Sequence, residues 1–232
     1  MKSDDNVLAA VAGYVDTLSY VALFGLFTAH VTGNFVLIGA TLVGHGQGIV
    51  LKLMAFPAFI AGVILSSVLV RSLPATRARH GGRLLYGVQA ALMLAFCVAG
   101  LLASPPQSAD SVPVMVAGML GAFAMGVQNA HARLIQRPGV PNTVMTGNVT
   151  QAILDAVDLC SGRADEALRK TARTRFSKML PAIVMFACGA AAGALAYRQF
   201  GFWALLAPVA ALAWLAWATQ EPIEVTTGPA KA

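Results

Sequence analysis

The stretch His30-Val31-Thr32-Gly33-Asn34 is echoed by Val144-Met145-Thr146-Gly147-Asn148, so that the Thr-Gly-Asn triplet returns 114 residues further along the chain. Two other short motifs recur in the same order. They are Gly13-Tyr14-Val15-Asp16 with Gly126-Val127-Gln128-Asn129, and Phe56-Pro57-Ala58 with Leu180-Pro181-Ala182. Three echoes in one order indicate an internal duplication. We therefore expect two repeats, residues 1–111 and 112–232, within a single domain.

The composition indicates that both repeats lie in a membrane. Of the 232 residues, 57% are apolar and only 11% are charged, and the mean hydropathy is +0.70. A soluble domain carries about 25% charged residues, so this chain has too few to cover a surface in water. The composition excludes a soluble globule, a disordered chain and a nucleic-acid-binding module. We expect an all-α polytopic membrane protein, surrounded by the lipid bilayer and without a nucleic-acid partner.

Six apolar stretches are long enough to cross a bilayer as helices, which takes about 20 residues. They cover residues 7–28, 50–70, 84–103, 112–132, 179–197 and 201–219. Two further stretches, 32–44 and 143–160, are shorter or more polar and are typical of re-entrant half-helices. Each repeat then crosses the membrane three times. Because three is odd, the second repeat is inverted relative to the first, an architecture that many transporters use.

The positive charges favour this topology, with both termini in the cytoplasm. With six crossings, 14 of the 16 Lys and Arg residues lie on the cytoplasmic side, whereas full crossing by both short stretches would split them 9 to 7. Lys and Arg gather in cytoplasmic loops. The net charge of +6 therefore needs no acidic partner to explain it.

The two Thr-Gly-Asn turns are the predicted substrate-binding site. The residues concerned are Thr32, Gly33, Asn34, Thr146, Gly147 and Asn148. Irregular backbone at membrane depth is tolerated only where it is buried in protein or lines a water-filled cavity. Thr or Asn can cap the helix that follows, and the first N–H groups of a helix attract anions and polar oxygens. Two such turns facing each other near the midplane would form a small polar site. In the alternative, they only pack the two halves together.

Asp16 is the predicted proton- or cation-coupling residue. It lies about ten residues into the first apolar stretch, roughly 15 Å along a helix. A carboxylate at such a depth is costly and usually functional. Its counterpart in the second repeat is the neutral Asn129, so that coupling would belong to one half only. The alternative is a structural hydrogen-bond acceptor with Thr17 and Ser19 as polar neighbours.

Four other polar residues near the repeated motifs are candidates for the pathway. His30 and His131 can gate or carry protons near neutral pH, although a histidine near the end of a span often bonds only to headgroups or water. Gln128 and Asn129 either line the pathway or hold helices together. The sequence has no metal-ligand spacing, no P-loop and no hydrolase elbow. We therefore expect no metal, no cofactor and no enzymatic activity.

We accordingly interpret the chain as a secondary transporter or channel for a small polar or anionic solute. A second interpretation is a membrane-embedded enzyme acting on a lipid or isoprenoid, with a divalent ion on Asp155 and Asp158, which share a helix face. A solvated cytoplasmic helix explains these two residues more simply. A third interpretation is a non-transporting scaffold. Gly189 and Gly193 permit close helix approach within or between subunits, so a homo-oligomer is a further alternative.

The motifs also resemble those of the YoaK-like family of bacterial membrane proteins. The first resembling segment is 13–20 with Phe27, 31–34 and Gly39, and the second is 126–130 with 141–150. The resemblance covers about residues 7–219. It implies a multi-pass protein of the bacterial inner membrane. It implies no established activity, substrate or catalytic residues.

Overall fold

A computed structural model describes residues 2–74, 80–134, 145–161 and 165–219, and every regular element in these ranges is helical. In the predicted first repeat, the helices are α1 (Lys2–Ala22), α2 (Gly33–Leu42), α3 (Ile49–Ser72) and α4 (Gly81–Leu102). In the predicted second repeat they are α5 (Val112–Leu134), α6 (Met145–Cys160), α7 (Glu166–Phe200), the 3-10 turn η2 (Gly201–Leu205) and α8 (Leu206–Ala218). The all-α prediction is confirmed.

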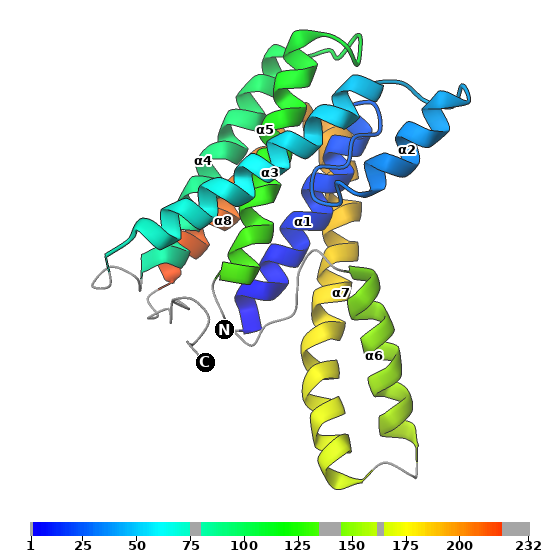
Figure 1. Cartoon of the computed structure of the whole chain (residues 1–232), viewed down its shortest axis with the longest axis vertical. Coiled ribbons are helices and arrows are strands. Elements are labelled where there is room, and N and C mark those ends of the chain that lie inside the picture. The colour runs from blue at the N-terminus through cyan, green and yellow to red at the C-terminus, as the bar shows by residue number, and fades with distance from the viewer. Residues whose placement is uncertain (1, 75–79, 135–144, 162–164, 220–232) are drawn as a thin grey trace, which may run out of the picture.

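The long helices alternate in direction. In Figure 1, α1, α4 and α7 run upward, whereas α3, α5 and α8 run downward. Helix α1 packs on α7, α3 packs on α5, and α4 packs on both α5 and α8. The short α2 lies against α3, and α6 lies beside the lower half of α7 (Figure 1). The largest apolar core joins α1, α4, α5 and α8 and includes Leu18, Phe96, Met125 and Leu212.

Four described segments are long and apolar enough to cross a membrane. They are α3, α4, α5 and the continuous helical run from Glu166 to Ala218, which contains α7, η2 and α8. Helix α1, which carries Asp4, Asp5 and Asp16, is not among them. The predicted crossing segments at 50–70, 84–103 and 112–132 coincide with α3, α4 and α5 to within three residues.

Helix α1 ends at Ala22, whereas the sequence predicted helix to residue 28. The backbone reverses at Phe24 and Gly25, which have φ values of 53° and 76°. The Lys52 ammonium donates to the Phe24 carbonyl at 2.8 Å and to the Gln47 carbonyl at 2.5 Å, and so holds this turn. Leu23 and Leu26 remain in the apolar core, which explains why the sequence pattern did not mark the end of the helix.

Helix α7 is longer than its predicted span of 179–197. It continues without a break through the charged segment down to Glu166. The Asp165 side chain caps its first turn by accepting a hydrogen bond from the Leu168 N–H at 2.7 Å. The second apolar stretch, 201–219, forms η2 and α8. Residues 143 and 144 of the predicted re-entrant segment lie outside the described residues.

Helices α1 and α7 touch backbone to backbone through glycines. A Cβ atom on Gly13 would overlap the carbonyl of Phe186, and one on Gly189 would overlap the carbonyl of Ala10. Contact this close excludes every residue that has a side chain at these positions. The spacing Gly189-Gly193, noted in the sequence, therefore serves a contact within the chain, because Gly193 meets the Tyr14 carbonyl in the same way.

Helices α3 and α5 touch in the same manner. A Cβ atom on Gly126 would overlap the carbonyl of Phe59, and one on Gly62 would overlap the carbonyl of Phe123. The positions in the two contacts correspond. Gly13 and Gly126 are 113 residues apart, as are Ala10 and Phe123, whereas Phe59 and Phe186 are 127 apart, as are Gly62 and Gly189. The α1–α7 contact is thus repeated, residue for residue, in the α5–α3 contact.

Candidate functional site

The Asp16 carboxylate is the centre of a buried polar cluster. The N–H groups of Thr28 and Ala29 both donate to its Oδ1 at 2.7 Å, and the N–H of His30 donates to Oδ2 at 3.3 Å. The ring Nδ1 of His30 lies 2.7 Å from the same Oδ2. Asp16 is only 4% exposed. These bonds satisfy a charge that would otherwise be costly to bury.

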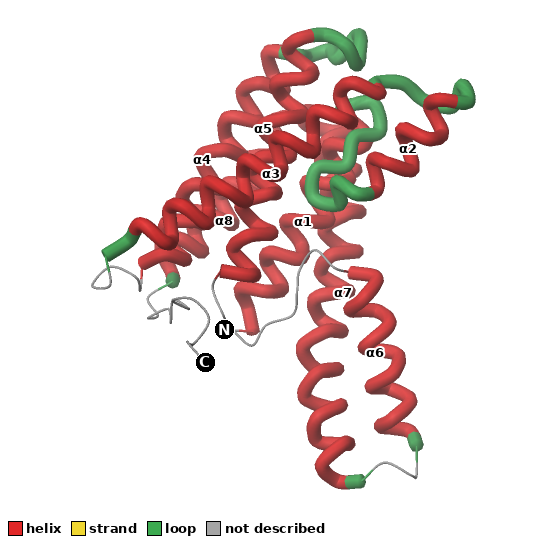
Figure 2. The backbone as a smooth tube through the Cα atoms, viewed as in Figure 1, coloured by secondary structure: helices red, strands yellow, loops and turns green. Residues whose placement is uncertain are grey.

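The segment that Asp16 holds reaches back along α1. Asp16 lies six residues before Ala22, where the helix ends, which corresponds to about 9 Å of helix. Thr28, Ala29 and His30 are therefore level with the interior of α1 and not with its end. Figure 2 shows this irregular segment folding back over α1 before α2 begins.

Two hydroxyl groups, one on α1 and one on the irregular segment, extend the cluster. The Ser19 Oγ donates to the Asp16 carbonyl at 3.0 Å and lies 3.1 Å from the Thr28 Oγ1, and both hydroxyl residues are fully buried. The His30 side chain is 31% exposed. Its ring makes an edge contact with Phe186 on α7, with centroids 5.4 Å apart. His30 thus connects the buried Asp16 both to the surface and to α7.

The first Thr-Gly-Asn turn is closed by its asparagine. The Asn34 Oδ1 accepts from the Phe27 N–H at 2.9 Å, and its Nδ2 donates to the Phe27 carbonyl at 2.8 Å. Asn34 is completely buried. Thr32 is exposed and makes no side-chain hydrogen bond to the start of α2. Of the two residues that could cap the helix, Thr32 does not do so, and Asn34 joins the two ends of the turn instead.

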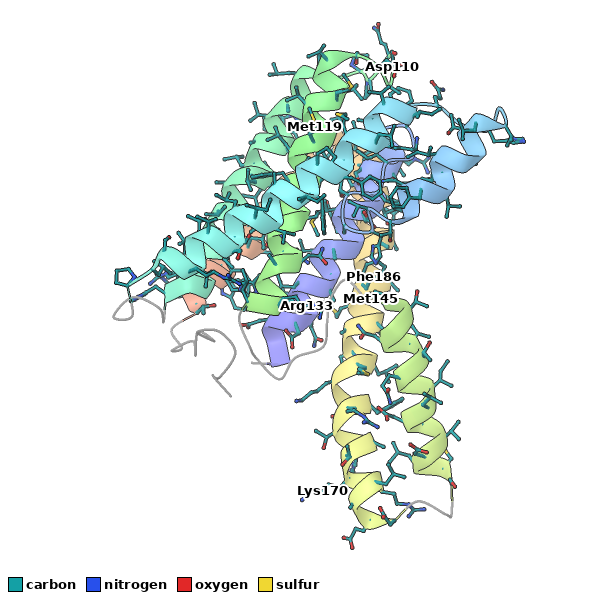
Figure 3. All side chains as sticks on the ribbon, viewed as in Figure 1. Asp110, Met119, Arg133, Met145, Lys170 and Phe186 are labelled. Atoms are coloured by element: carbon teal, nitrogen blue, oxygen red, sulfur yellow. The ribbon has the colours of Figure 1, made fainter. Side chains whose placement is uncertain are left out.

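The second Thr-Gly-Asn triplet forms the first turn of α6. Thr146 and Gly147 are exposed, whereas Asn148 is 3% exposed and its Nδ2 lies 4.0 Å from the Met145 sulfur. Met145 and Phe186 pack against the same small cluster on α1 and α7 (Figure 3). The segments that lead into α2 and α6 thus lie beside one part of α7. A meeting of the two triplets at a shared site stays a prediction.

Gln128 joins three helices. Its Oε1 accepts from the Gln89 Nε2 on α4 at 2.6 Å, and its Nε2 donates to the Leu8 carbonyl on α1 at 2.8 Å. Both glutamines are at most 1% exposed. Asn129 is partly buried and donates to the Met125 carbonyl one turn earlier at 3.1 Å. Asn129 borders a pocket between α3 and α5.

His131 lies in the protein interior. It is 4% exposed and stacks on Tyr86 of α4, with ring centroids 4.3 Å apart and an interplanar angle of 28°. The sequence alternative, in which a histidine near the end of a span contacts headgroups or water, is therefore wrong for His131.

Asp155 connects α6 to α7. It is fully buried, and Arg175 reaches its carboxylate with Nη2 at 2.6 Å and Nε at 3.1 Å, while Gln151 donates at 3.0 Å. The described residues contain no group of three or more His, Cys, Asp or Glu side chains placed to hold a metal ion. The Asp155 carboxylate instead forms an ion pair with Arg175 that joins α6 to α7.

Three buried polar residues were missed from the sequence. Lys52 holds the turn after α1, Gln89 bonds to Gln128, and Tyr86 stacks on His131. A lysine and a glutamine inside otherwise apolar spans were the available signal, because such residues are costly there and need a partner. Each residue bonds to a partner far away in the sequence. The sequence could therefore have indicated that these residues need partners, but not which partners they have.

Comparisons with known proteins agree with a membrane location. A family described as "Protein of unknown function (DUF1275)" matches residues 6–218. The UPF0700 transmembrane protein YoaK of Bacillus subtilis (strain 168) is 28% identical over 206 residues, which are 88% of this chain and 87% of that relative. No solved structure matches the chain. With its apolar helices and this bacterial transmembrane relative, the chain is a multi-pass integral membrane protein.

Proposed function

From the premise that this chain belongs to the DUF1275 family, as its YoaK-like motifs predicted, we propose that it is a secondary transporter or channel for a small polar or anionic solute. The observation that carries the proposal is the Asp16 carboxylate, buried within α1 and bonded to the irregular backbone of Thr28, Ala29 and His30. Irregular backbone and a carboxylate inside a membrane protein are both costly, and both typically mark a solute or ion pathway.

The proposed topology has six crossings and two re-entrant helices in an inverted repeat. The alternation of the long helices in Figure 1 supports six crossings. The matching glycine contacts of α1 with α7 and of α5 with α3 support a duplicated unit. Since three crossings separate the units, one is inverted relative to the other, and transporters of this kind bind solute where the repeats meet. The distribution of Lys and Arg residues supports a cytoplasmic position for both termini.

Asp16 acts as the coupling group in this proposal. A carboxylate accepts stronger hydrogen bonds than a protonated carboxyl group does. A proton that reaches Asp16 through His30, 2.7 Å away, therefore weakens the bonds to the N–H groups of residues 28–30. The turn that leads into Thr32-Gly33-Asn34 is then released. Proton uptake and opening of the pathway are therefore coupled. In this proposal Thr146-Gly147-Asn148 forms the other side of the solute site.

Reconstituted vesicles test this proposal. The full chain is placed in liposomes with an internal pH dye, and candidate anions and polar solutes are added with and without a proton gradient. We expect a solute-dependent proton flux that falls at least tenfold in Asp16→Asn and in Asn34→Ala. Gly39→Ala is the control, because a Cβ there meets nothing within 4 Å. If both variants move every transported solute at the wild-type rate, the assignment fails.

One observation favours a scaffold as the second candidate. The side chains of Asn34 and Gln128 bond to protein groups, as packing devices would. A vesicle assay in which the wild-type protein moves no solute, while Asp16→Asn lowers only the unfolding temperature, would support the scaffold. The enzyme alternative has less support, because Arg175 occupies the Asp155 carboxylate. Divalent-ion binding that disappears in Asp155→Asn would favour it.

A further inference from the structure

A pocket lies between α3 and α5, and Asp16 is not among the residues that line it. Its volume is about 300 Å³, and it is lined by Phe59, Val63 and Ser67 from α3 and by Asn129, Ala130, Arg133 and Leu134 from α5. The walls are mostly apolar. The polar groups are one hydroxyl, one amide and one guanidinium. An apolar pocket with a few convergent polar groups is the usual form of a small-molecule site.

Arg133 gives the pocket its charge. It lies one helical turn after Asn129 and therefore on the same face of α5, near the lower end of that helix (Figure 3). Within the described ranges, Arg133 makes no ion pair and no hydrogen bond. A guanidinium at the edge of an apolar pocket binds a carboxylate through two parallel hydrogen bonds. The pocket therefore offers a place for one anionic group.

The internal repeat indicates the shape of the group that would fit in the pocket beside the carboxylate. Asn129 corresponds to Asp16 at the 113-residue spacing, and Phe59 corresponds to Phe186 at the 127-residue spacing. In the first repeat, the ring of His30 occupies the space between these residues, 2.7 Å from the Asp16 carboxylate and 5.4 Å from the Phe186 centroid. In the second repeat, Phe59 and Asn129 border the pocket. The pair of residues that holds the His30 ring in the first repeat thus has counterparts in the wall of this pocket.

We propose that this pocket binds a small organic carboxylate with a planar apolar body. The carboxylate lies against Arg133 and the Asn129 amide, and the body lies against Phe59 and Val63. The pocket is near the end of α5 that shares a side with the N-terminus (Figure 1). Binding of a carboxylate in this pocket does not depend on the proposed transport function. The role of the pocket as the inner station of a pathway rests on the proposed function.

Benzoate and benzamide test the proposal, since they have the same shape but differ in charge. Binding to the purified full-length protein is measured by titration calorimetry in lipid nanodiscs. We expect saturable benzoate binding and at least tenfold weaker benzamide binding. Arg133→Gln should weaken benzoate at least tenfold, and Arg133→Lys less. Arg173→Gln is the control, since Arg173 is an exposed arginine on α7, and it should bind as the wild type does.

Three results would overturn the proposal. They are no saturable benzoate binding by the wild-type protein, equal affinity for benzamide, or unchanged affinity in Arg133→Gln. Asn129→Ala provides a second variant in case Arg133→Gln is unstable, and it should weaken benzoate about threefold to tenfold. Because no gradient is involved, a transport failure at Asp16 and a binding failure at Arg133 are separate results.

Discussion

The Nδ1 atom of His30 lies 2.7 Å from the Oδ2 of Asp16, and the same carboxylate accepts the backbone N–H of His30. The ring and the segment that carries it are therefore held by one buried group. The Asp16 side chain is 5% exposed and that of His30 is 31% exposed. The histidine is therefore the more accessible member of the pair, and the buried carboxylate joins it to the segment that precedes α2.

Asp16 should contribute much more to stability than His30 does. The carboxylate anchors three N–H groups, whereas His30 supplies one of several donors. Charge-assisted hydrogen bonds contribute about 1.5–3 kcal/mol each, and a buried donor left without a partner costs about 1–3 kcal/mol. We expect Asp16→Ala to lower the unfolding free energy by about 3 kcal/mol or more, and His30→Gln by less than about 1 kcal/mol. Tryptophan fluorescence during thermal unfolding in detergent measures both. Equal losses would mean that the carboxylate does not hold the segment.

The matching glycine contacts predict matching costs. Gly13→Ala and Gly126→Ala each place a methyl group against a backbone carbonyl of the facing helix. Overpacking against rigid backbone costs about 1–3 kcal/mol or more. Gly87→Ala is the control, because it lies inside α4 and a Cβ there meets nothing within 4 Å. The control should be neutral or stabilising by roughly 0.5–1 kcal/mol, as is usual for this change within a helix. A common effect in all three variants would refute the close contacts.

Much of this fold follows from hydropathy. Crossing segments such as 50–70 and 84–103 coincide with α3 and α4, because an apolar run of that length has to be helical in lipid. The end of α1 could not be predicted in this way. Leu23 and Leu26 continue the apolar run, but they belong to a turn held by Lys52 from a later helix. A contact between distant parts of the chain overrides the local pattern there.

The sequence predicted a repeat, but it did not predict the register in which α3 and α7 correspond. The Pro57 and Pro181 echo gives a spacing of 124 residues, whereas the packed backbones of Gly62 and Gly189 give 127. The three-residue difference is nearly one helical turn. A proline marks only a permissive position, whereas a glycine in backbone contact fixes the position of its helix. Asp16 was identified from its cost in the membrane, and its partners appeared only in the folded chain.

The ion pair of Asp155 with Arg175 should hold the α6–α7 hairpin together. Asp155 is fully buried, so removal of its partner leaves a buried charge without compensation, which is strongly destabilising. We expect Arg175→Gln to lower the unfolding temperature clearly, and Arg173→Gln, on the exposed side of α7, to leave it unchanged. In a double-mutant cycle, Arg175→Gln should cost less when Asp155 is already Asn. Purely additive losses would show that the two side chains act independently.

Single cysteines decide whether the chain crosses the membrane six times. In a background without Cys97, Cys160 and Cys188, cysteines replace four other residues, namely Gln47, Gln107, Arg133 and Lys170, all of which are exposed. Intact cells are treated with a membrane-impermeant maleimide before and after permeabilisation. Six crossings predict that positions 47 and 107 label from outside and that 133 and 170 label only after permeabilisation. Labelling of 133 and 170 from opposite sides would mean that α6 crosses the membrane. The second repeat would then have four crossings, an even number, and the inversion on which the facing Thr-Gly-Asn turns depend would be lost.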